Sequence, residues 1–319
     1  MKASIIILNW NGSEADCIES VDSAFAQDYR NIEIIFVDNG SSNGSGVAIR
    51  ALYPQLVYIQ LDQNIGCPPG RNVGAMRAEG DLLFFLENDG AWDDQKLVSS
   101  AVELFKKEKK LGAVYTRVEG YHTGVIDSPL DPQPIANTET GLYLSSSFRG
   151  GASIIRTELF LSCGGFPQDF FRQCEERFLS LIIYNKGYQV AYWPEFSLRH
   201  KGSDYAGKTA AVSSFNVENN LKTIMRLYPL VPSIIVGLPK WLVGMLALVK
   251  TGLWRQALSI TRGLVIEQFS PSIYERINLE TFCDVESLRQ GHDISRTVGG
   301  EIAAQPLSRL MFRRLFLGA

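Results

Sequence analysis

Two carboxylates stand one residue apart directly after an apolar run. The run at residues 82–86 is followed by Glu87, Asn88 and Asp89. A buried strand would bring its last residues to the rim of a sheet, where α/β proteins bind their ligands. Two oxygen ligands from one strand end suit Mg²⁺ or Mn²⁺ carrying a substrate diphosphate. A solvated acidic turn would show the same short pattern, so the flanking sequence has to decide between the two.

Polar residues also follow two earlier apolar runs. Residues 4–9 end in Asn9 and lead to Asn11, and residues 32–37 lead to Asp38. Because the carboxyl ends of parallel strands lie along one edge of a sheet, we expect these side chains to meet Glu87 and its neighbours at one crevice. Asp38 precedes an Asn-Gly pair, so it would serve equally well as a turn-forming residue.

A glycine-rich segment lies between these strand ends. It runs from Asn64 through Arg71 to residue 74 and leads into a predicted helix, so a ligand could approach its backbone closely. The chain has no GxGxxG after its first apolar run, which weakens a nicotinamide-cofactor interpretation. It also has no GxxxxGK[ST] phosphate loop.

The elements that would position these residues alternate between strands and helices. Strands are expected at 4–9, 32–37, 56–61 and 81–86, and helices at 14–26, 45–53 and 68–79. This alternation predicts an α/β fold with a mostly parallel, doubly wound sheet. Beyond it we expect a loop at 121–140, a strand at 150–155, a helix at 175–185 and a strand at 188–193.

Composition narrows the functional class. The chain has 319 residues with 45% hydrophobic content and a net charge of −3, which argues against a nucleic-acid binder. Its five cysteines include no CxxC pair, which predicts a reducing compartment and no structural zinc. No secretory signal precedes the first predicted strand, so we expect a cytoplasmic protein.

A different pattern begins near residue 203. Helices are expected at 213–227, 232–250, 254–267 and 273–289, so we predict a catalytic domain at 1–205 and a helical region at 206–319. Residues 230–254 are strongly apolar but are interrupted by Pro239 and Lys240. That pattern fits a helix lying on a membrane and a buried helix about equally well. The mixed cationic and apolar tail at 309–316 favours peripheral contact with the anionic inner face of the cell membrane.

A family resemblance appears once the segments are taken in order. SIIILNWNG, IIFVDNGSSNGS, NIGCPPGRNVGAMRAEGDLLFFLENDG, GGFPQDFFRQCEERFLSLIIYNKGY and PEFSLRH resemble the family 2 glycosyltransferases with the GT-A fold. Within that family the chain is similar to rhamnosyltransferase-like enzymes of bacterial surface-polysaccharide assembly, over residues 4 to about 203. The resemblance implies an inverting, metal-dependent transfer of a hexosyl or deoxyhexosyl group from a UDP- or dTDP-linked sugar. The acceptor would be a hydroxyl of a lipid-linked or polysaccharide glycan.

The resemblance also implies roles for the strand-end residues. Asp38 matches the family's aspartate that bonds the nucleotide base, and Arg71 falls where a basic residue lies near the nucleotide. Glu87 and Asn88 take part in the family's DxD motif, in which Asp89 holds the divalent ion on the diphosphate. Asn9, Asn11 and Asn64 complete the expected donor site.

Glu175 and Glu176 fall in the family's ED motif at the start of a predicted helix. The second carboxylate there is the general base, although carboxylates at a helix start also stabilise the helix. His200 occupies the position of a histidine close to the metal. Phe178 replaces a usual aspartate and both ED positions are glutamate, so a non-catalytic sugar-nucleotide-binding or scaffold module is the alternative. A sugar-nucleotide pyrophosphorylase is disfavoured, because its glycine-rich loop is missing.

Overall fold

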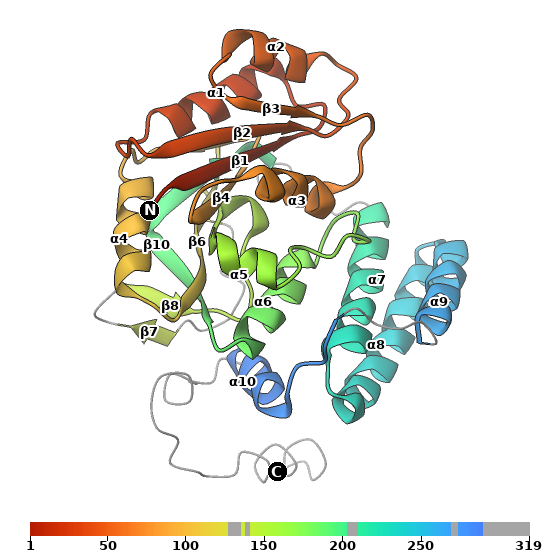
Figure 1. Ribbon diagram of the computed structural model, residues 1–319. Helices are drawn as coiled ribbons and strands as arrows, with labels where there is room; N and C mark the ends of the chain where they lie inside the picture. Colours follow the sequence, from red (N-terminus) through yellow and green to blue (C-terminus); the bar gives the residue numbers. More distant parts are fainter. Residues whose placement is uncertain (127–134, 138–140, 203–209, 269–273, 290–319) are drawn as a thin grey trace.

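A computed structural model describes residues 1–126, 135–137, 141–202, 210–268 and 274–289 (Figure 1). Ten strands in this described part form one sheet, in the order β3-β2-β1-β4-β9-β6-β10-β8-β7, and β5 pairs with β10. The strands are β1 Ala3–Asn9, β2 Ile32–Asp38, β3 Val57–Gln60, β4 Leu82–Glu87, β5 Gly90–Trp92, β6 Leu111–Gly120, β7 Ile135–Asn137, β8 Leu142–Leu144, β9 Ser153–Arg156 and β10 Gln189–His200.

The four N-terminal strands are parallel, as the sequence predicts. β1 lies between β2 and β4, with Asn9 opposite Asp38 and Leu8 opposite Glu87. This register brings the polar residues that follow the three strands to the same edge of the sheet. β1 and β4 are almost completely buried because both faces of the sheet are covered.

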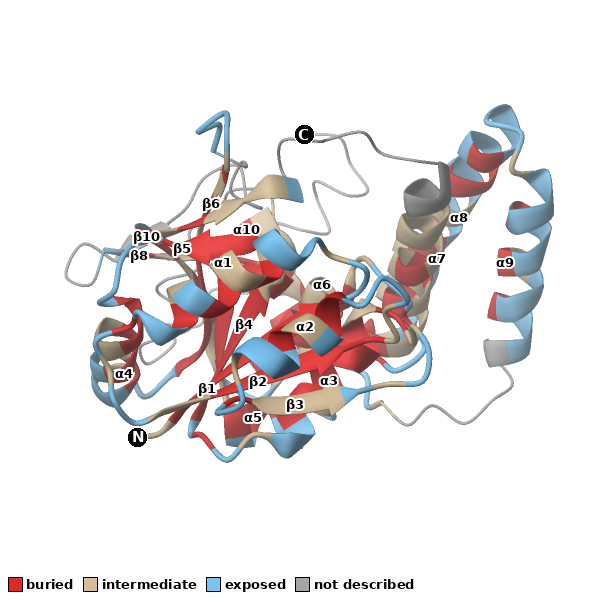
Figure 2. Cartoon of the chain, turned by 90° about the horizontal axis from the view of Figure 1, so that it is seen from above, coloured by how far each residue is buried: buried red, intermediate tan, exposed pale blue. Residues whose placement is uncertain are grey.

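Helices cover both faces of the sheet, which gives the expected doubly wound architecture. Alternate residues of β1 enter two separate hydrophobic cores: Ile5 and Ile7 face one, and Ile6 and Leu8 face the other. One face carries α1 Glu14–Phe25, α2 Ser45–Leu52 and α4 Leu97–Lys107. The other carries α3 Cys67–Arg77, α5 Thr157–Ser162 and α6 Glu175–Asn185. Figure 2 shows the buried residues concentrated between these layers.

The second half of the sheet is mixed, which the prediction of a mostly parallel sheet did not include. β9 runs antiparallel to both β4 and β6, whereas β6 and β10 are parallel. β6 and α4 lie in a segment for which no element was predicted, and the short β7 falls inside the predicted loop at 121–140. Short edge strands of this kind depend on their pairing partners rather than on their own periodicity.

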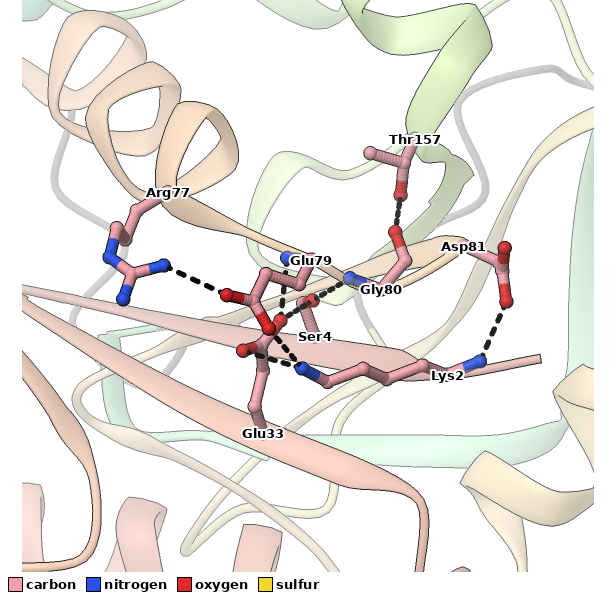
Figure 3. Close-up of polar contacts among 8 residues, drawn as sticks. All are labelled: Lys2, Ser4, Glu33, Arg77, Glu79, Gly80, Asp81 and Thr157. Atoms are coloured by element: carbon pink, nitrogen blue, oxygen red, sulfur yellow. Dashed lines mark hydrogen bonds and ion pairs between the residues drawn. The ribbon is translucent and has the colours of Figure 1, made fainter.

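A polar network links the amino ends of the strands, at the side of the sheet opposite the strand ends described above (Figure 3). The Lys2 ammonium lies 3.0 Å from Glu33 and 2.9 Å from Glu79, joining β1, β2 and the segment before β4. The Ser4 hydroxyl donates to Glu33 at 2.5 Å and accepts the Gly80 N–H at 2.9 Å. These contacts fix the amino ends of the strands, so this edge has a structural role.

The C-terminal region is helical, as predicted. It contains α7 Ala210–Leu227, α8 Leu230–Lys250, α9 Trp254–Gln268 and α10 Leu279–Arg289. α10 starts six residues later than the predicted 273, because Asn278 caps it by accepting the Thr281 N–H at 2.7 Å. The tail at 309–316 lies outside the described residues.

The predicted boundary near residue 205 does not separate two hydrophobic cores. Ile224 and Tyr228, in and just after α7, and Phe282 of α10 pack into the same core as Phe178 of α6. α8 and α9 form their own small cluster with Leu221 of α7. Figures 1 and 2 both show α8 and α9 on the outer side of α7, away from the sheet. The division at 205 stays a prediction about sequence pattern.

Candidate active site

A cavity of about 810 Å³ opens at the carboxyl edge of the sheet. Its wall includes the residues after β4, the end of β10, the start of α6 and the glycine-rich turn before β9. The predicted site residues that line it are Asn64, Arg71, Glu87, Asn88, Asp89, Glu175, Glu176 and His200. Residues separated by more than a hundred positions in the chain therefore share one pocket, in which the residues after β4 meet Glu175, Glu176 and His200.

Asp89 and His200 form a pair at one side of this cavity. The antiparallel pairing of β5 with β10 places His200 opposite Gly90, beside the end of β4. His200 Nε2 lies 3.1 Å from Asp89 Oδ1, and the Gly202 N–H donates to Asp89 Oδ2 at 3.0 Å. Burial alone would raise the pKa of Asp89, but the hydrogen bond and charge of His200 outweigh it and lower that pKa. Asp89 is therefore held as a carboxylate.

This pair has the chemistry to hold a divalent ion. No group of three His, Cys, Asp or Glu side chains gathers for a metal within the described residues. Mg²⁺ usually needs only one or two protein carboxylates, because substrate phosphates and waters complete its octahedron. Mn²⁺ accepts carboxylate and imidazole ligands. Asp89 and His200 supply one of each, so the two residues fit a metal carried by a diphosphate.

Arg71 lies on α3 at the floor of the cavity and is only 4% exposed. Its guanidinium forms a short ion pair with Glu87 and lies 3.3 Å from Glu175 Oε1. Burial would lower the pKa of Arg71, but the neighbouring carboxylates, Glu87 first, raise it. Glu87, the first carboxylate of the predicted DxD motif, is therefore engaged by an internal cation. We infer that Asp89, rather than Glu87, is the protein carboxylate available to a metal.

The two glutamates of the predicted ED motif have different environments. Glu175 is 3% exposed, and its Oε2 atom has no hydrogen-bond partner among the described residues. Burial and the neighbouring Glu176 carboxylate raise the pKa of Glu175. Glu176 is partly exposed, faces the cavity and accepts the Gly150 N–H at 3.1 Å. The geometry therefore favours Glu176 as the group that can reach a substrate.

The backbone just before these glutamates is in an unfavourable conformation. Gln173 and Cys174 have φ values of 74° and 69°, a left-handed region that non-glycine residues rarely adopt. α7 holds this turn, because the Asn219 side chain donates to the carbonyls of Arg172 and Gln173 at 2.9 and 2.8 Å. The helical region thus sets where α6, and with it Glu176, begins. Sequence reasoning missed this contact because it joins segments more than forty residues apart.

Asn9 is fully buried, and its amide is occupied by internal hydrogen bonds. It donates to Ser45 at 2.9 Å and accepts from Asn88 at 3.0 Å and from the Gly12 N–H at 3.1 Å. We therefore infer that Asn9 positions the strand ends and does not bind a ligand itself. Asn11 lies outside the cavity lining and accepts the Ser42 N–H at 2.8 Å.

Asp38 lies beside Asn9 and is 2% exposed. It accepts the Ser41 N–H at 3.0 Å and the Tyr58 hydroxyl at 3.1 Å, so it forms the turn that its Asn-Gly context allowed. It does not line the cavity. Asn64 lines the cavity, and its side-chain oxygen accepts a hydrogen bond from the Asn39 side chain at 3.0 Å. A direct contact of Asp38 with a nucleotide base stays a prediction and would require this turn to open.

The turn Gly150–Ala152 was not predicted as part of the site. A side chain at Gly150 would collide with Arg71 and Glu176, and one at Gly151 would collide with Glu87. Glycine is therefore needed for the backbone to approach the carboxylates closely. The sequence signal is the Gly-Gly pair itself, but the prediction assigned this pair to a strand at 150–155.

Comparison with solved structures identifies the fold. The fold is the GT-A fold. Staphylococcus aureus TarS 1-349 in complex with UDP-GlcNAc aligns with a TM-score of 0.59 at 18% identity, covering 92% of this chain and 93% of TarS. The mannosyltransferase PcManGT of Pyrobaculum calidifontis, in complex with GDP-Man and Mn²⁺, aligns with a TM-score of 0.56 at 17% identity, covering 91% and 85%.

Sequence comparison finds relatives for part of the chain. Residues 4–160 match Glycosyl transferase family 2, and this match supports a family 2 glycosyltransferase domain there. An uncharacterized glycosyltransferase of Haemophilus influenzae is 28% identical over 51% of this chain and 55% of its own length. The O-antigen biosynthesis protein RfbC of Myxococcus xanthus is 30% identical over 57% of this chain and 16% of its own length. The chain thus spans about half or less of these relatives.

Proposed function

We propose that this protein is an inverting, metal-dependent glycosyltransferase that moves one sugar from a nucleotide-sugar donor to an acceptor hydroxyl. The observation that carries the proposal is the single cavity at the carboxyl edge of the sheet. Glu176 faces this cavity, and the Asp89–His200 pair lines its wall. A base for the acceptor and ligands for a diphosphate-bound metal thus share one space. The family 2 match and the nucleotide-sugar complexes of TarS and PcManGT support the same activity.

The donor would bind with its diphosphate near Asp89 and His200. A Mg²⁺ or Mn²⁺ ion held there would neutralise charge developing on the leaving nucleoside diphosphate. Asn64 and Asn88 offer amide groups along the same wall. UDP- and dTDP-sugars are the donors we propose, with a hexosyl or deoxyhexosyl group. The buried Arg71 lies below the cavity and holds Glu87 and Glu175 in place.

Glu176 would act as the general base. The acceptor hydroxyl gives its proton to the Glu176 carboxylate while its oxygen attacks the anomeric carbon. The bond from that carbon to the diphosphate oxygen breaks, and its electron pair leaves with the nucleoside diphosphate. One in-line displacement of this kind inverts the anomeric configuration. The hydrogen bond from the Gly150 N–H fixes one carboxylate oxygen and leaves the other for the acceptor.

The acceptor would be a lipid-linked or polysaccharide glycan at the inner face of the cell membrane. The protein would then have a rhamnosyltransferase-like role in surface-glycan synthesis. α8 is the one helix in the described part of the chain that is long and apolar enough to cross a membrane. It exposes a stripe that includes Leu238, Leu242 and Leu246, each more than half exposed. That exposure does not fit a buried helix and supports a membrane-surface contact. The O-antigen relative supports the surface-glycan role.

The test is turnover and donor binding by Asp89→Asn. We expect the variant to lose at least about 100-fold in transfer rate with UDP- or dTDP-sugars and Mn²⁺, because charge stabilisation of the leaving group is removed. Asp28→Asn is the matched control, since Asp28 is an exposed aspartate at the amino edge of the sheet. Unchanged turnover in Asp89→Asn would reject the proposed metal site. Metal-dependent donor binding without transfer or donor hydrolysis in the unmodified protein would favour the non-catalytic alternative.

A further inference from the structure

A second cavity, of about 510 Å³, lies on the other side of the α6 start from the active site. α6, α7, α8 and α10 each contribute to its wall. The cavity combines three cations, Arg177, Lys240 and Arg289, with apolar residues that include Val217, Leu221 and Val243. No Asp or Glu is among the described residues that line it. Cations and aliphatic walls together are the chemistry that an anionic amphiphile would match.

Among the described residues that line this cavity, positive charge exceeds negative charge. Arg177 lies 3.2 Å from Glu286, and Arg289 lies 2.7 Å from the same carboxylate, so one anion serves both arginines. Lys240 adds a further positive charge. It makes no hydrogen bond or ion pair with the described residues, although it is only partly exposed and interacts electrostatically with both arginines. The Nε atom of Arg177 is also buried without a hydrogen-bond partner in the described part of the chain.

The charge excess indicates which kind of phosphate would fit. A phosphate monoester carries about −1.5 to −2 charge at neutral pH, whereas the phosphodiester of an ordinary membrane lipid carries only one negative charge. A diphosphate that links a lipid to a glycan also carries about two negative charges, one on each phosphorus, so either group matches a cluster of three cations better than a phosphodiester does. Arginine and lysine both bind phosphate oxygens through charge-assisted hydrogen bonds.

The apolar surroundings indicate that the phosphate would be attached to a lipid. Lys240 lies on α8 and faces the cavity, while α8 exposes its apolar stripe elsewhere on its surface. A membrane that contacts that stripe would lie beside the cavity. A long-chain lipid could then remain in the membrane while its phosphate enters the cationic site.

The cavity is connected to the catalytic end of α6. Arg177 follows Glu176 directly, so one turn of helix carries both the proposed base and a cavity cation. Asn216 and Asn220 line the cavity and also contact Cys174, whose Sγ atom lies 3.4 Å from Asn216 Oδ1 and 3.2 Å from Asn220 Nδ2. A ligand in the cavity would therefore touch the residues that hold the left-handed turn before Glu176.

We propose that this cavity binds the phosphate head of a long-chain lipid, and that such a lipid carries the glycan acceptor through a diphosphate link. The assignment of this lipid as the carrier of the acceptor rests on the proposed function. The binding itself needs neither donor nor metal. Anchoring the phosphate beside Arg177 would hold the acceptor glycan close to Glu176 and restrict its orientation.

The experiment measures flotation of the full chain with phosphatidylcholine vesicles. One set contains polyprenyl phosphate, a second contains phosphatidylglycerol at matched surface charge, and a third contains uncharged polyprenol. Lys240→Gln is compared with Lys250→Gln, which removes the same charge from an exposed position on the same helix. Because Lys240 has no ion-pair partner among the described residues, its variant should keep the melting temperature of the unmodified protein.

We expect the unmodified protein to prefer polyprenyl phosphate vesicles over both other sets. Lys240→Gln should weaken that binding by about five-fold or more, whereas Lys250→Gln should keep the preference. Equal losses in both variants would overturn the proposal, because they would show general surface attraction. Equal, Lys240-dependent binding to phosphatidylglycerol would overturn the acceptor assignment. No preference for polyprenyl phosphate in the unmodified protein would overturn the site. None of these outcomes affects the Asp89 test, which uses donor and metal.

Discussion

Replacing Arg71 with methionine should destabilise the protein more than replacing an exposed arginine on the same helix. Arg71 is 4% exposed and lies between Glu87 and Glu175. Methionine would preserve much of the volume but leave these carboxylates without their cation. Removing one partner of a buried ion pair costs about 3–5 kcal/mol, because the remaining charge stays in a low-dielectric site.

The expected loss is large compared with the stability of an ordinary domain, which is about 5–15 kcal/mol. At about 2 °C per kcal/mol, the value for the larger chains, the melting temperature should fall by about 6–10 °C near neutral pH. The loss should shrink as the pH is lowered, because protonation of the orphaned carboxylates removes their buried charge. Glu175 contributes little to this recovery, because burial and Glu176 already raise its pKa to about 8, so it is largely protonated at neutral pH in both proteins.

The assay is thermal unfolding of both proteins across a range of mildly acidic to neutral pH. Arg77→Met is the matched control: Arg77 lies on the same helix, is 53% exposed and is paired at 3.4 Å with an exposed Glu79. Exposed pairs contribute about 0–1 kcal/mol, so this variant should melt close to the unmodified protein. The reasoning would be wrong if the two variants melted alike, or if the Arg71→Met deficit grew on acidification.

Three further predictions concern the turn before α6, the buried glutamate and the apolar helix. Asn219→Ala should lower kcat more than it raises the donor KM in steady-state kinetics, because two hydrogen bonds hold the turn that positions the base; a change in KM alone would contradict this. Glu175→Gln should flatten the pH dependence of the free energy of unfolding. The pKa of Glu175 is raised in the folded protein, so its contribution to stability is complete below the unfolded pKa of 4.5 and is lost as the pH rises to about 8. Equal slopes of stability against pH in both proteins would contradict this prediction. Replacing Leu238 and Leu242 together with serine should weaken vesicle binding at least about ten-fold with little change in melting temperature, whereas Leu279→Ser on α10 should change neither.

The sequence predicted the elements that depend on local patterns. Helix α6 begins at Glu175, as predicted, and the apolar runs ending at Asn9 and Asp38 are adjacent strands. The reason is that strand and helix periodicity, and the polar residues that end each run, are properties of neighbouring residues in the chain. The parallel orientation of these strands then follows from the alternation of strands with helices. The convergence of Glu176 and His200 with Glu87 and Asp89 on one cavity was expected only from the family resemblance, because it depends on the mixed second half of the sheet.

Tertiary structure decided which of these polar groups are available. Asn9 and Asp38 have the residue types of ligand-binding groups, but internal hydrogen bonds occupy them. Glu87 is paired with Arg71 from another element, which leaves Asp89 as the carboxylate that we propose for a metal. Whether a side chain is engaged depends on groups that are distant in sequence, and no local pattern records those groups.

The same limit applies to the helical region. Its apolar pattern allowed either a buried helix or a membrane-surface helix for residues 232–250, and only packing showed which face of α8 is covered. Packing also brought Asn219 of α7 to the strained turn before Glu176 and gathered Arg177, Lys240 and Arg289 in one cavity. The sequence by itself determined the four N-terminal parallel strands, the helices between them and the reactive residue types, because these depend on near neighbours. The tertiary structure determined which residues meet, because burial and charge pairing depend on contacts between distant segments.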